Sequence, residues 1–260
     1  MKLSASNIGW AAEDDNRIYK ALAERGFQGL EIAPTRVFPQ PAYEKLEQAA
    51  AFAARLKADY GLTVPSMQSI WFGRQENIFG SLQDKALLIE YTKKAVDFAA
   101  AIGCKNLVFG CPRNRAVPEG KDQNEALAFF SQLGEYAHIN RCTIALEANP
   151  PIYNTNYLNT TAEAFAAAKC CGKGVSVNLD IGTVIQNGES LSSLADKLHM
   201  VSHIHISEPY LAPIEERALH RELADLIRTC GYEGFVSVEM KAQPFDDVIR
   251  ILDYVSEVFA

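Results

Sequence analysis

The stretch AAIGCKNLVF, at residues 100–109, reads as the end of a helix, a glycine and the start of an apolar strand. ERGFQGLEI (24–32) and RTCGYEGFVSVEM (228–240) repeat the same order. A glycine at such a joint adopts the left-handed conformation that ends a helix, and the apolar run after it is typical of a buried strand. The three joints predict a chain in which helices and strands alternate.

Eight short apolar runs extend this alternation over all 260 residues, with an average of about 32 residues for each unit. Amphipathic stretches follow most of the runs, so we expect a parallel sheet with the helices outside. We predict an α/β fold, a (β/α)8 TIM barrel that forms a single domain over residues 1–260. A doubly wound open sheet is the alternative, but no G-x-G-x-x-G follows the first strand. The expected strands are 3–9, 29–34, 63–70, 105–110, 143–148, 175–182, 203–207 and 235–241.

The net charge, the apolar segments and the cysteines limit the partners and the compartment that we expect for this protein. The net charge is −7, whereas proteins that bind nucleic acid usually carry a basic patch, so we expect no nucleic-acid partner. The first residues lack the apolar segment of a signal peptide, and no apolar run is long enough to cross a membrane. We expect a cytoplasmic protein that does not bind membranes, and the six cysteines, without a C-x-x-C motif, are expected to be free thiols.

Four acidic or imidazole side chains stand at the ends of four consecutive expected strands: Glu147, Asp180, His205 and Glu239. In a TIM barrel these ends build the active site, and spacings of about one β/α unit place the four at one level. Three crowded carboxylates repel one another, and a divalent cation removes that cost. We predict one divalent ion here; the ligands suit Mn²⁺ or Mg²⁺, with Zn²⁺ and Co²⁺ as alternatives.

Each of these residues also has an ordinary structural interpretation. A glutamate at a strand end is often solvated at the rim, His205 could be a core histidine, and Asp180 could cap the next helix. The layer below supports the metal site, because residues two positions earlier point the same way. Asn178, His203 and Ser237 are polar at those positions, and they are expected to support the ligands. Glu31, at the end of the second strand, is a candidate for a deeper polar partner.

Short motifs surround these four residues: LEAN (146–149), NLDIG (178–182), HIHISEP (203–209) and VSVEMK (236–241). Together with TNYLNTTAEA (155–164), they resemble the xylose isomerase-like TIM barrels, in particular the sugar (phosphate) isomerase and ketose 3-epimerase branch. The resemblance runs over nearly the whole chain and is strongest over 142–241. It implies a metal-dependent enzyme that acts on a small sugar, and a homodimer is an expectation from the family alone.

Three positions depart from the family pattern. Many relatives carry D-x-x-H after the sixth strand, where this chain has Thr183. Ketose 3-epimerases carry a second glutamate where Asn154 stands, and an arginine soon after the strand-seven histidine, where the first arginine here is Arg217. The resemblance therefore does not carry over the substrate of those enzymes.

Further substrate contacts are expected from residues at the same rim. Arg113 and Arg115 follow the fourth strand, and arginine suits a carboxylate or phosphate, although both could be exposed loop residues. Trp71 follows the third strand with Phe72 and could wall a sugar face or pack in the core. The other candidates are Asn149, Glu208 and Lys241, which lie next to the predicted ligands.

The preferred function is a metal-dependent isomerase or epimerase of a small sugar or sugar-derived substrate. Glu147 and Glu239 are the predicted catalytic pair: one removes the proton next to a carbonyl, and the other returns a proton to the metal-stabilised enediolate. A dehydratase or lyase could start with the same proton abstraction. An abasic-site endonuclease and a sugar-binding barrel without activity are the remaining alternatives.

Overall fold

The computed structural model describes residues 1–259, and its strands and helices alternate along the chain. All paired strands are parallel. The strands are β1 (Lys2–Ser6), β2 (Gly29–Glu31), β3 (Ser66–Met67), β4 (Asn106–Phe109), β5 (Thr143–Glu147), β6 (Val175–Asp180), β7 (Val201–Ile206) and β8 (Phe235–Val238).

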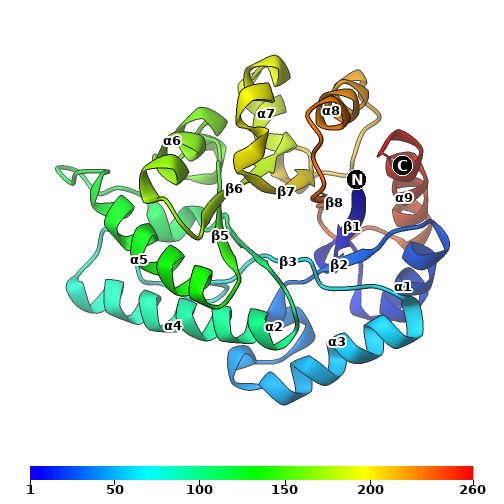
Figure 1. Cartoon of the computed structure of the whole chain (residues 1–260), viewed down its shortest axis with the longest axis horizontal. Helices are drawn as coiled ribbons and strands as arrows, with labels where there is room; N and C mark the ends of the chain where they lie inside the picture. Colours follow the sequence, from blue (N-terminus) through cyan, green and yellow to red (C-terminus); the bar gives the residue numbers. More distant parts are fainter. Residues whose placement is uncertain (260) are drawn as a thin grey trace.

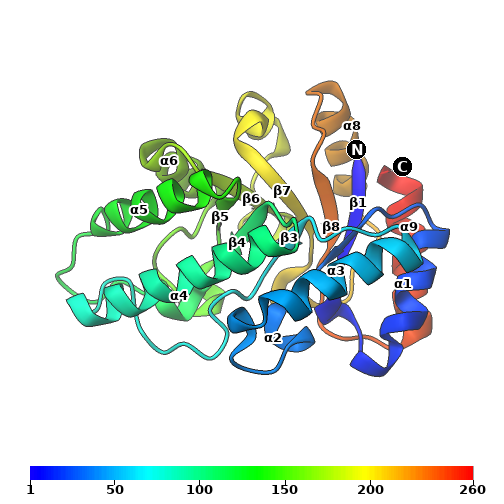
Figure 2. The ribbon, with the colours of Figure 1, turned by 60° about the horizontal axis from the view of Figure 1, so that its bottom comes forward.

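Helices surround the sheet (Figure 1). The α-helices are α1 (Asp15–Glu24), α2 (Pro34–Val37), α3 (Leu46–Tyr60), α4 (Leu82–Ala101), α5 (Glu125–Ile139), α6 (Thr161–Cys171), α7 (Ile181–Asn187), α8 (Ala218–Thr229) and α9 (Phe245–Phe259). Short 3-10 helices occupy Asn7–Gly9, Ala12–Asp14, Ala42–Glu44, Pro112–Arg115, Pro151–Tyr153, Leu191–Met200 and Pro209–Leu211. Figure 2 shows α3 and α4 lying across the same side of the barrel.

The order of the strands closes the sheet into a barrel. The ladder runs β2-β1-β8-β7-β6-β5-β4-β3, so the first strand pairs with the last. Two isolated bridges, Gly29–Thr63 and Ile32–Met67, join its two edges. The predicted single-domain TIM barrel is confirmed, and the open doubly wound sheet is excluded because its first and last strands would not meet.

Local sequence explains the joints and the strand lengths. Gly26, Gly103 and Gly231 have φ values of 76°, 72° and 68°, which is the left-handed conformation expected at these helix ends. The third strand is shorter than predicted at both ends. Pro65, which has no backbone N–H to donate to a ladder, directly precedes its first residue, and Ser69, with a φ of 52°, leaves the extended conformation two residues after its last. The other strands begin or end within a few residues of the predicted positions.

The barrel interior is unusually polar. Several polar side chains at alternate strand positions are fully or almost fully buried: Ser4, Glu31, Ser66, Asn106, Asn178, His203 and Ser237. The residues between them, such as Leu3, Ile144 and Val236, belong to the apolar layer between strands and helices. Because side chains alternate along a strand, the sheet presents a polar lining to the barrel axis and an apolar face to the helices.

All six cysteines are free, as expected. Within residues 1–259, no helix has the length and apolar character needed to cross a membrane.

Candidate metal centre

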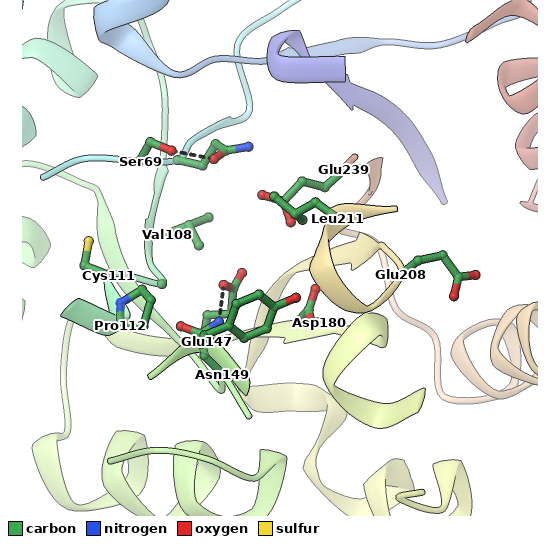
Figure 3. A pocket seen from close by; sticks show the side chains of 13 residues that line it. Ser69, Val108, Cys111, Pro112, Glu147, Asn149, Asp180, Glu208, Leu211 and Glu239 are labelled. Atoms are coloured by element: carbon green, nitrogen blue, oxygen red, sulfur yellow. Dashed lines mark hydrogen bonds between the residues drawn. The ribbon is translucent and has the colours of Figure 1, made fainter. Parts of the chain in front are cut away.

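The carboxyl ends of four neighbouring strands bring together Glu147, Asp180, His205 and Glu239. Glu147, Asp180 and His205 lie at or next to the last residues of β5, β6 and β7, and Glu239 directly follows β8. One potential ligand atom from each of the four lies within 4.8 Å of the others. Figure 3 shows the three carboxylates around one cavity.

Backbone pairing shows how the four reach the same height. Asp180 pairs with His205, but Glu147 pairs with Asn178, and His205 pairs with Ser237. The ligand position therefore advances by two residues from β5 to β6 and again from β7 to β8. Strands of a barrel are tilted and their register is staggered, so residues at one height are not direct ladder partners. The four share a level along the barrel axis, as predicted, but they do not share one register.

His205 is the centre of the cluster and has 0% of its surface exposed. Its Nδ1 lies 3.1 Å from a carboxylate oxygen of Glu147 and 3.1 Å from one of Glu239. Its Nε2 lies 3.0 Å from Glu31. Burial alone would lower the pKa of His205, but the carboxylates of Glu239 and Glu31 outweigh burial and raise this pKa well above its usual value. A proton and a cation thus compete for Nδ1.

Asp180 has both a structural and a potential ligand role. Its Oδ1 accepts hydrogen bonds from the backbone N–H of Thr183 at 2.6 Å and the hydroxyl of Thr183 at 2.8 Å, and so caps α7. Its Oδ2 accepts from the Ser207 hydroxyl. Burial and the neighbouring Glu147 raise the pKa of Asp180 to about 6. Thr183 therefore orients a ligand candidate.

Glu147 is held through both carboxylate oxygens. Oε1 accepts from Nδ2 of Asn149 at 3.1 Å, and Oε2 accepts from Nδ2 of Asn178 at 2.7 Å. A β-carbon at Gly110 would clash with Oε1, so only glycine leaves room for this carboxylate. On the other side of the cluster, burial raises the pKa of Glu239 to about 7, although His205 opposes the shift.

Below the cluster, Glu31 is fully buried and contacts several polar side chains of the barrel interior. It accepts hydrogen bonds from the hydroxyls of Ser66 at 2.8 Å and Ser237 at 3.0 Å. Burial would raise the pKa of Glu31, but His205 and His203 hold it well below its usual value. The predicted deeper residues differ in their contacts. Asn178 touches a ligand candidate, Ser237 touches Glu31, and Nε2 of His203 only approaches Glu31 at 3.6 Å.

The donor set fits a divalent cation. Bonds from oxygen or nitrogen to such ions are about 2.0–2.6 Å long, so ligands on opposite sides of one ion stand roughly 4–5 Å apart. The four candidate atoms, all within 4.8 Å of one another, match that span. Three carboxylates in one buried cluster repel one another strongly, and a cation offsets this repulsion. The cluster is therefore able to bind one metal ion.

A cavity of about 240 Å³ opens above the cluster. It is lined by Gln68, Ser69, Val108, Gly110, Cys111, Pro112, Glu147, Asn149, Tyr153, Asp180, Glu208, Leu211 and Glu239. Asn149 and Glu208, two of the predicted substrate contacts, are among these residues. Four other predicted contacts do not: Arg113, Arg115, Trp71 and Lys241.

The two arginines have different environments. Arg113 is exposed, and its guanidinium donates to the side-chain carbonyl of Gln75 at 3.2 Å. Arg115 has 0% of its surface exposed, so the prediction of a substrate contact is wrong for it. Burial lowers the pKa of Arg115 to about 10, although the charge of Glu147 opposes the shift. Both arginines belong to the short 3-10 helix Pro112–Arg115, but the side chain of Arg113 lies in solvent and that of Arg115 lies in the protein interior.

Packing also explains the other corrections. Trp71 is 2% exposed, and its indole donates to the hydroxyl of Thr92 at 2.8 Å, so it belongs to the core and not to a sugar-binding wall. Lys241 is exposed outside the cavity. Glu208 turns its carboxylate away from the cluster (Figure 3), where Arg217 binds it through two hydrogen bonds of 2.7 Å. Arg217 thus compensates a buried acidic group.

Several cavity residues did not emerge from the sequence. Gln68 and Ser69 directly follow β3, so the rule that strand ends build the site could have found them. Tyr153 and Leu211 end short 3-10 helices at the rim, where nothing in the sequence pattern predicts the direction of a side chain. Ser207 was also missed, although it lies two residues after His205 and binds Asp180.

The fold and the site together define a TIM barrel whose acidic mouth is able to bind a cation. The model of the xylose isomerase-like TIM barrel family matches residues 19–255, and the chain belongs to this family. The family predicted from the motifs is therefore confirmed.

Solved structures of the same fold include several sugar epimerases. D-psicose 3-epimerase from Clostridium cellulolyticum, solved with D-tagatose, superposes with a TM-score of 0.79 at 16% identity, covering 100% of this chain and 99% of that one. The 3-keto-D-glucoside 4-epimerase from E. coli gives 0.74 at 18% identity, covering 99% and 98%. A family 2 AP endonuclease from Brucella melitensis gives 0.71 at 19% identity, covering 100% and 97%. At these identities the likeness establishes the fold alone. A comparison with curated protein sequences gives no match.

Proposed function

We propose that this protein is a divalent-metal-dependent isomerase or epimerase of a small, uncharged sugar. The observation that carries the proposal is the convergence of Glu147, Asp180, His205 and Glu239 below a cavity of about 240 Å³. The oxygen-rich ligand set favours Mn²⁺ or Mg²⁺. The sugar epimerases among the structures of the same fold support the same class of reaction.

The proposed reaction uses two carboxylates that approach the cavity from different strands. When bound, the ion would polarise a substrate carbonyl and so make the neighbouring C–H more acidic. Glu147 removes that proton from one face of the carbon, and Glu239 delivers a proton to the other face or to the adjacent atom. Asp180 and His205 hold the ion, and the cavity walls orient the sugar.

The charges around the cavity favour an uncharged substrate. Three acids line the cavity without a basic partner among its lining residues: Glu147, Asp180 and Glu239. A fourth, Glu208, is paired with Arg217, and no arginine, lysine or histidine lines the cavity within the described chain. A phosphate or carboxylate needs cationic or N–H donors for recognition. We therefore propose that sugar phosphates and sugar acids are poorer substrates than the corresponding neutral ketoses.

The nuclease alternative has less support from the site. The chain has five histidines, and His205 is the one that joins the four-residue cluster at the mouth. Thr183 stands where many relatives place a further histidine, and His220 is a buried residue of α8 whose Nδ1 lies 2.9 Å from the Tyr254 hydroxyl. One ion, not a group of several zinc ions, is the proposed content.

The test is proton exchange in deuterated water. The protein is incubated with Mn²⁺ or Mg²⁺ and a panel of ketoses, inososes, sugar acids and sugar phosphates; the ion is then chelated and the products are analysed by proton NMR. We expect deuterium at the carbon next to the carbonyl, together with an epimer or isomer. Loss of water would instead identify a dehydratase. The proposal would be overturned if none of the neutral ketoses exchanged a proton for deuterium, or if the protein nicked abasic DNA. Asp180→Asn is the control for metal dependence.

A further inference from the structure

Arg115 is a fully buried arginine that forms no ion pair among the described residues; apart from its hydrogen bonds, its guanidinium carbon lies 5.9 Å from the centroid of the Phe109 ring. Within residues 1–259, no carboxylate forms an ion pair with its guanidinium, and its Nε has no hydrogen-bond partner. Burying an unpaired charge is costly, so its place next to the cluster requires an explanation. All four acceptors of its hydrogen bonds are uncharged: the carbonyls of Glu147 (2.8 Å), Leu158 (3.4 Å) and Phe109 (3.5 Å), and Oδ1 of Asn149 (2.8 Å).

Two of these hydrogen bonds connect Arg115 with Glu147, one directly and one through Asn149. One holds the backbone carbonyl of Glu147 at the end of β5. The other holds Oδ1 of Asn149, whose Nδ2 donates to Oε1 of Glu147 at 3.1 Å. A side-chain amide accepts on one side and donates on the other. Because Arg115 binds the accepting side, the donating side of Asn149 must face Glu147.

The second carboxylate oxygen of Glu147 is held independently. Nδ2 of Asn178 donates to Oε2 at 2.7 Å. The two amides thus fix the plane of the carboxylate, and the absence of a side chain at Gly110 leaves room for it. If Asn149 turned over, its carbonyl oxygen would face Oε1, and the two acceptors would repel each other. The orientation of Asn149 is therefore a condition for the orientation of Glu147.

We infer that Arg115 is a positioning residue for Glu147: it sets the orientation of Asn149, and Asn149 orients the carboxylate that ligates the ion and, on the proposed function, removes the substrate proton. Arg115 does not touch the substrate, because it is buried and does not line the cavity.

The test compares Arg115→Met with Arg113→Met. Arg113 lies on the same helical turn but is exposed and bound to Gln75, so its variant is the matched control. Mn²⁺ affinity of the metal-free protein is measured by titration calorimetry without any sugar, and kcat and KM are measured separately. For Arg115→Met we expect Mn²⁺ affinity and kcat to fall by about 10–100-fold, which is typical when a group behind a metal ligand is lost. KM should stay near the wild-type value, and Arg113→Met should change nothing.

A double-mutant cycle tests the route through Asn149. Asn149→Leu breaks the same chain of hydrogen bonds, so the double variant Arg115→Met/Asn149→Leu should bind Mn²⁺ almost as well as the weaker single variant. Arg115→Lys keeps the charge and a single donor, and we expect partial recovery of Mn²⁺ affinity. If circular dichroism shows that Arg115→Met does not fold, the Mn²⁺ affinities of Arg115→Lys and Asn149→Leu are compared with that of the wild type instead.

Three results would overturn the inference. These are wild-type Mn²⁺ affinity and kcat in folded Arg115→Met, a rise in KM alone, or fully additive effects in the cycle. The rise in KM alone would return Arg115 to a substrate contact. A wild-type protein that binds Mn²⁺ but exchanges no sugar proton would contradict the proposed function, while the Mn²⁺ affinities of the variants would still decide the role of Arg115.

Discussion

Nε2 of His205 lies 3.0 Å from a carboxylate oxygen of Glu31, and both side chains are fully buried. Nδ1 of the same ring faces the carboxylates of Glu147 and Glu239. A ring nitrogen that binds a cation carries no proton, and the hydrogen bond at the opposite nitrogen fixes where the proton stays. Glu31 therefore favours the tautomer that leaves Nδ1 free for the ion.

This relationship predicts that Glu31→Gln weakens metal binding without changing any ligand. Glutamine keeps the size of the side chain but not its charge, so the proton on Nε2 loses its anionic acceptor. We expect Mn²⁺ affinity to fall by about 10–100-fold in titration calorimetry. Glu222→Gln, on the exposed side of α8, is the control and should bind Mn²⁺ as the wild type does. Equal affinities for both variants would show that Glu31 is not needed for the ligand geometry.

The proposed proton transfers predict the effect of removing either carboxylate. Glu147→Gln and Glu239→Gln keep the size and one oxygen, so part of the metal should remain bound. Proton transfer by a positioned group contributes about 10²–10⁴-fold, and each variant should lose at least that much of kcat. Metal content and turnover are to be measured on the same sample. Near-normal turnover in a metal-loaded variant would remove that residue from the acid–base pair.

The raised pKa values of Asp180, about 6, and Glu239, about 7, predict how pH affects the metal-free protein. Unfolded carboxyls have pKa values of about 3.9–4.3, so the folded chain binds protons more tightly between pH 4 and 7, and its stability falls as pH rises through this range. His205, whose pKa is raised well above its usual value, acts in the same direction at higher pH.

A bound cation replaces those protons, so its stabilising effect should increase with pH. The measurement is the Tm with saturating Mn²⁺ minus the Tm with chelator, at intervals from pH 5.5 to 8. We expect this difference to increase steadily over the range. The Asp180→Asn/Glu239→Gln double variant is the control, and its difference should be small at every pH. A constant difference in the wild type would contradict the assignment of these carboxyls as ligands.

Gly110→Ala tests the space next to Glu147. The added methyl group would meet Oε1 of Glu147, so the carboxylate has to move although no charged group is altered. A displacement of this kind can reduce turnover by about 10²-fold. The readouts are kcat and Mn²⁺ affinity, and both should fall while Tm with chelator changes little. Lys121→Ala, an exposed position in the connection between β4 and α5 and outside the cavity, is the control and should retain both values.

Most of the fold could be predicted from local sequence alone. The glycine joints, the apolar runs and the helical stretches each depend on the properties of neighbouring residues, so alternation of strands and helices was visible without the structure. The rule that a TIM barrel builds its site at the strand ends then singled out Glu147, Asp180, His205 and Glu239, which the structure places within 4.8 Å of one another.

The roles of the surrounding residues depended on the tertiary structure. Arg113 and Arg115 are equivalent in the sequence, yet one is exposed and the other is buried behind Glu147, because a short helical turn points them in different directions. Trp71 lies in the core and not at the cavity, because its side chain packs inward and its indole N–H donates to Thr92. Glu31 reaches His205 across 174 residues of chain only because the barrel closes. Sequence periodicity determines which face of a strand a residue occupies, whereas strand stagger and packing determine what each side chain contacts.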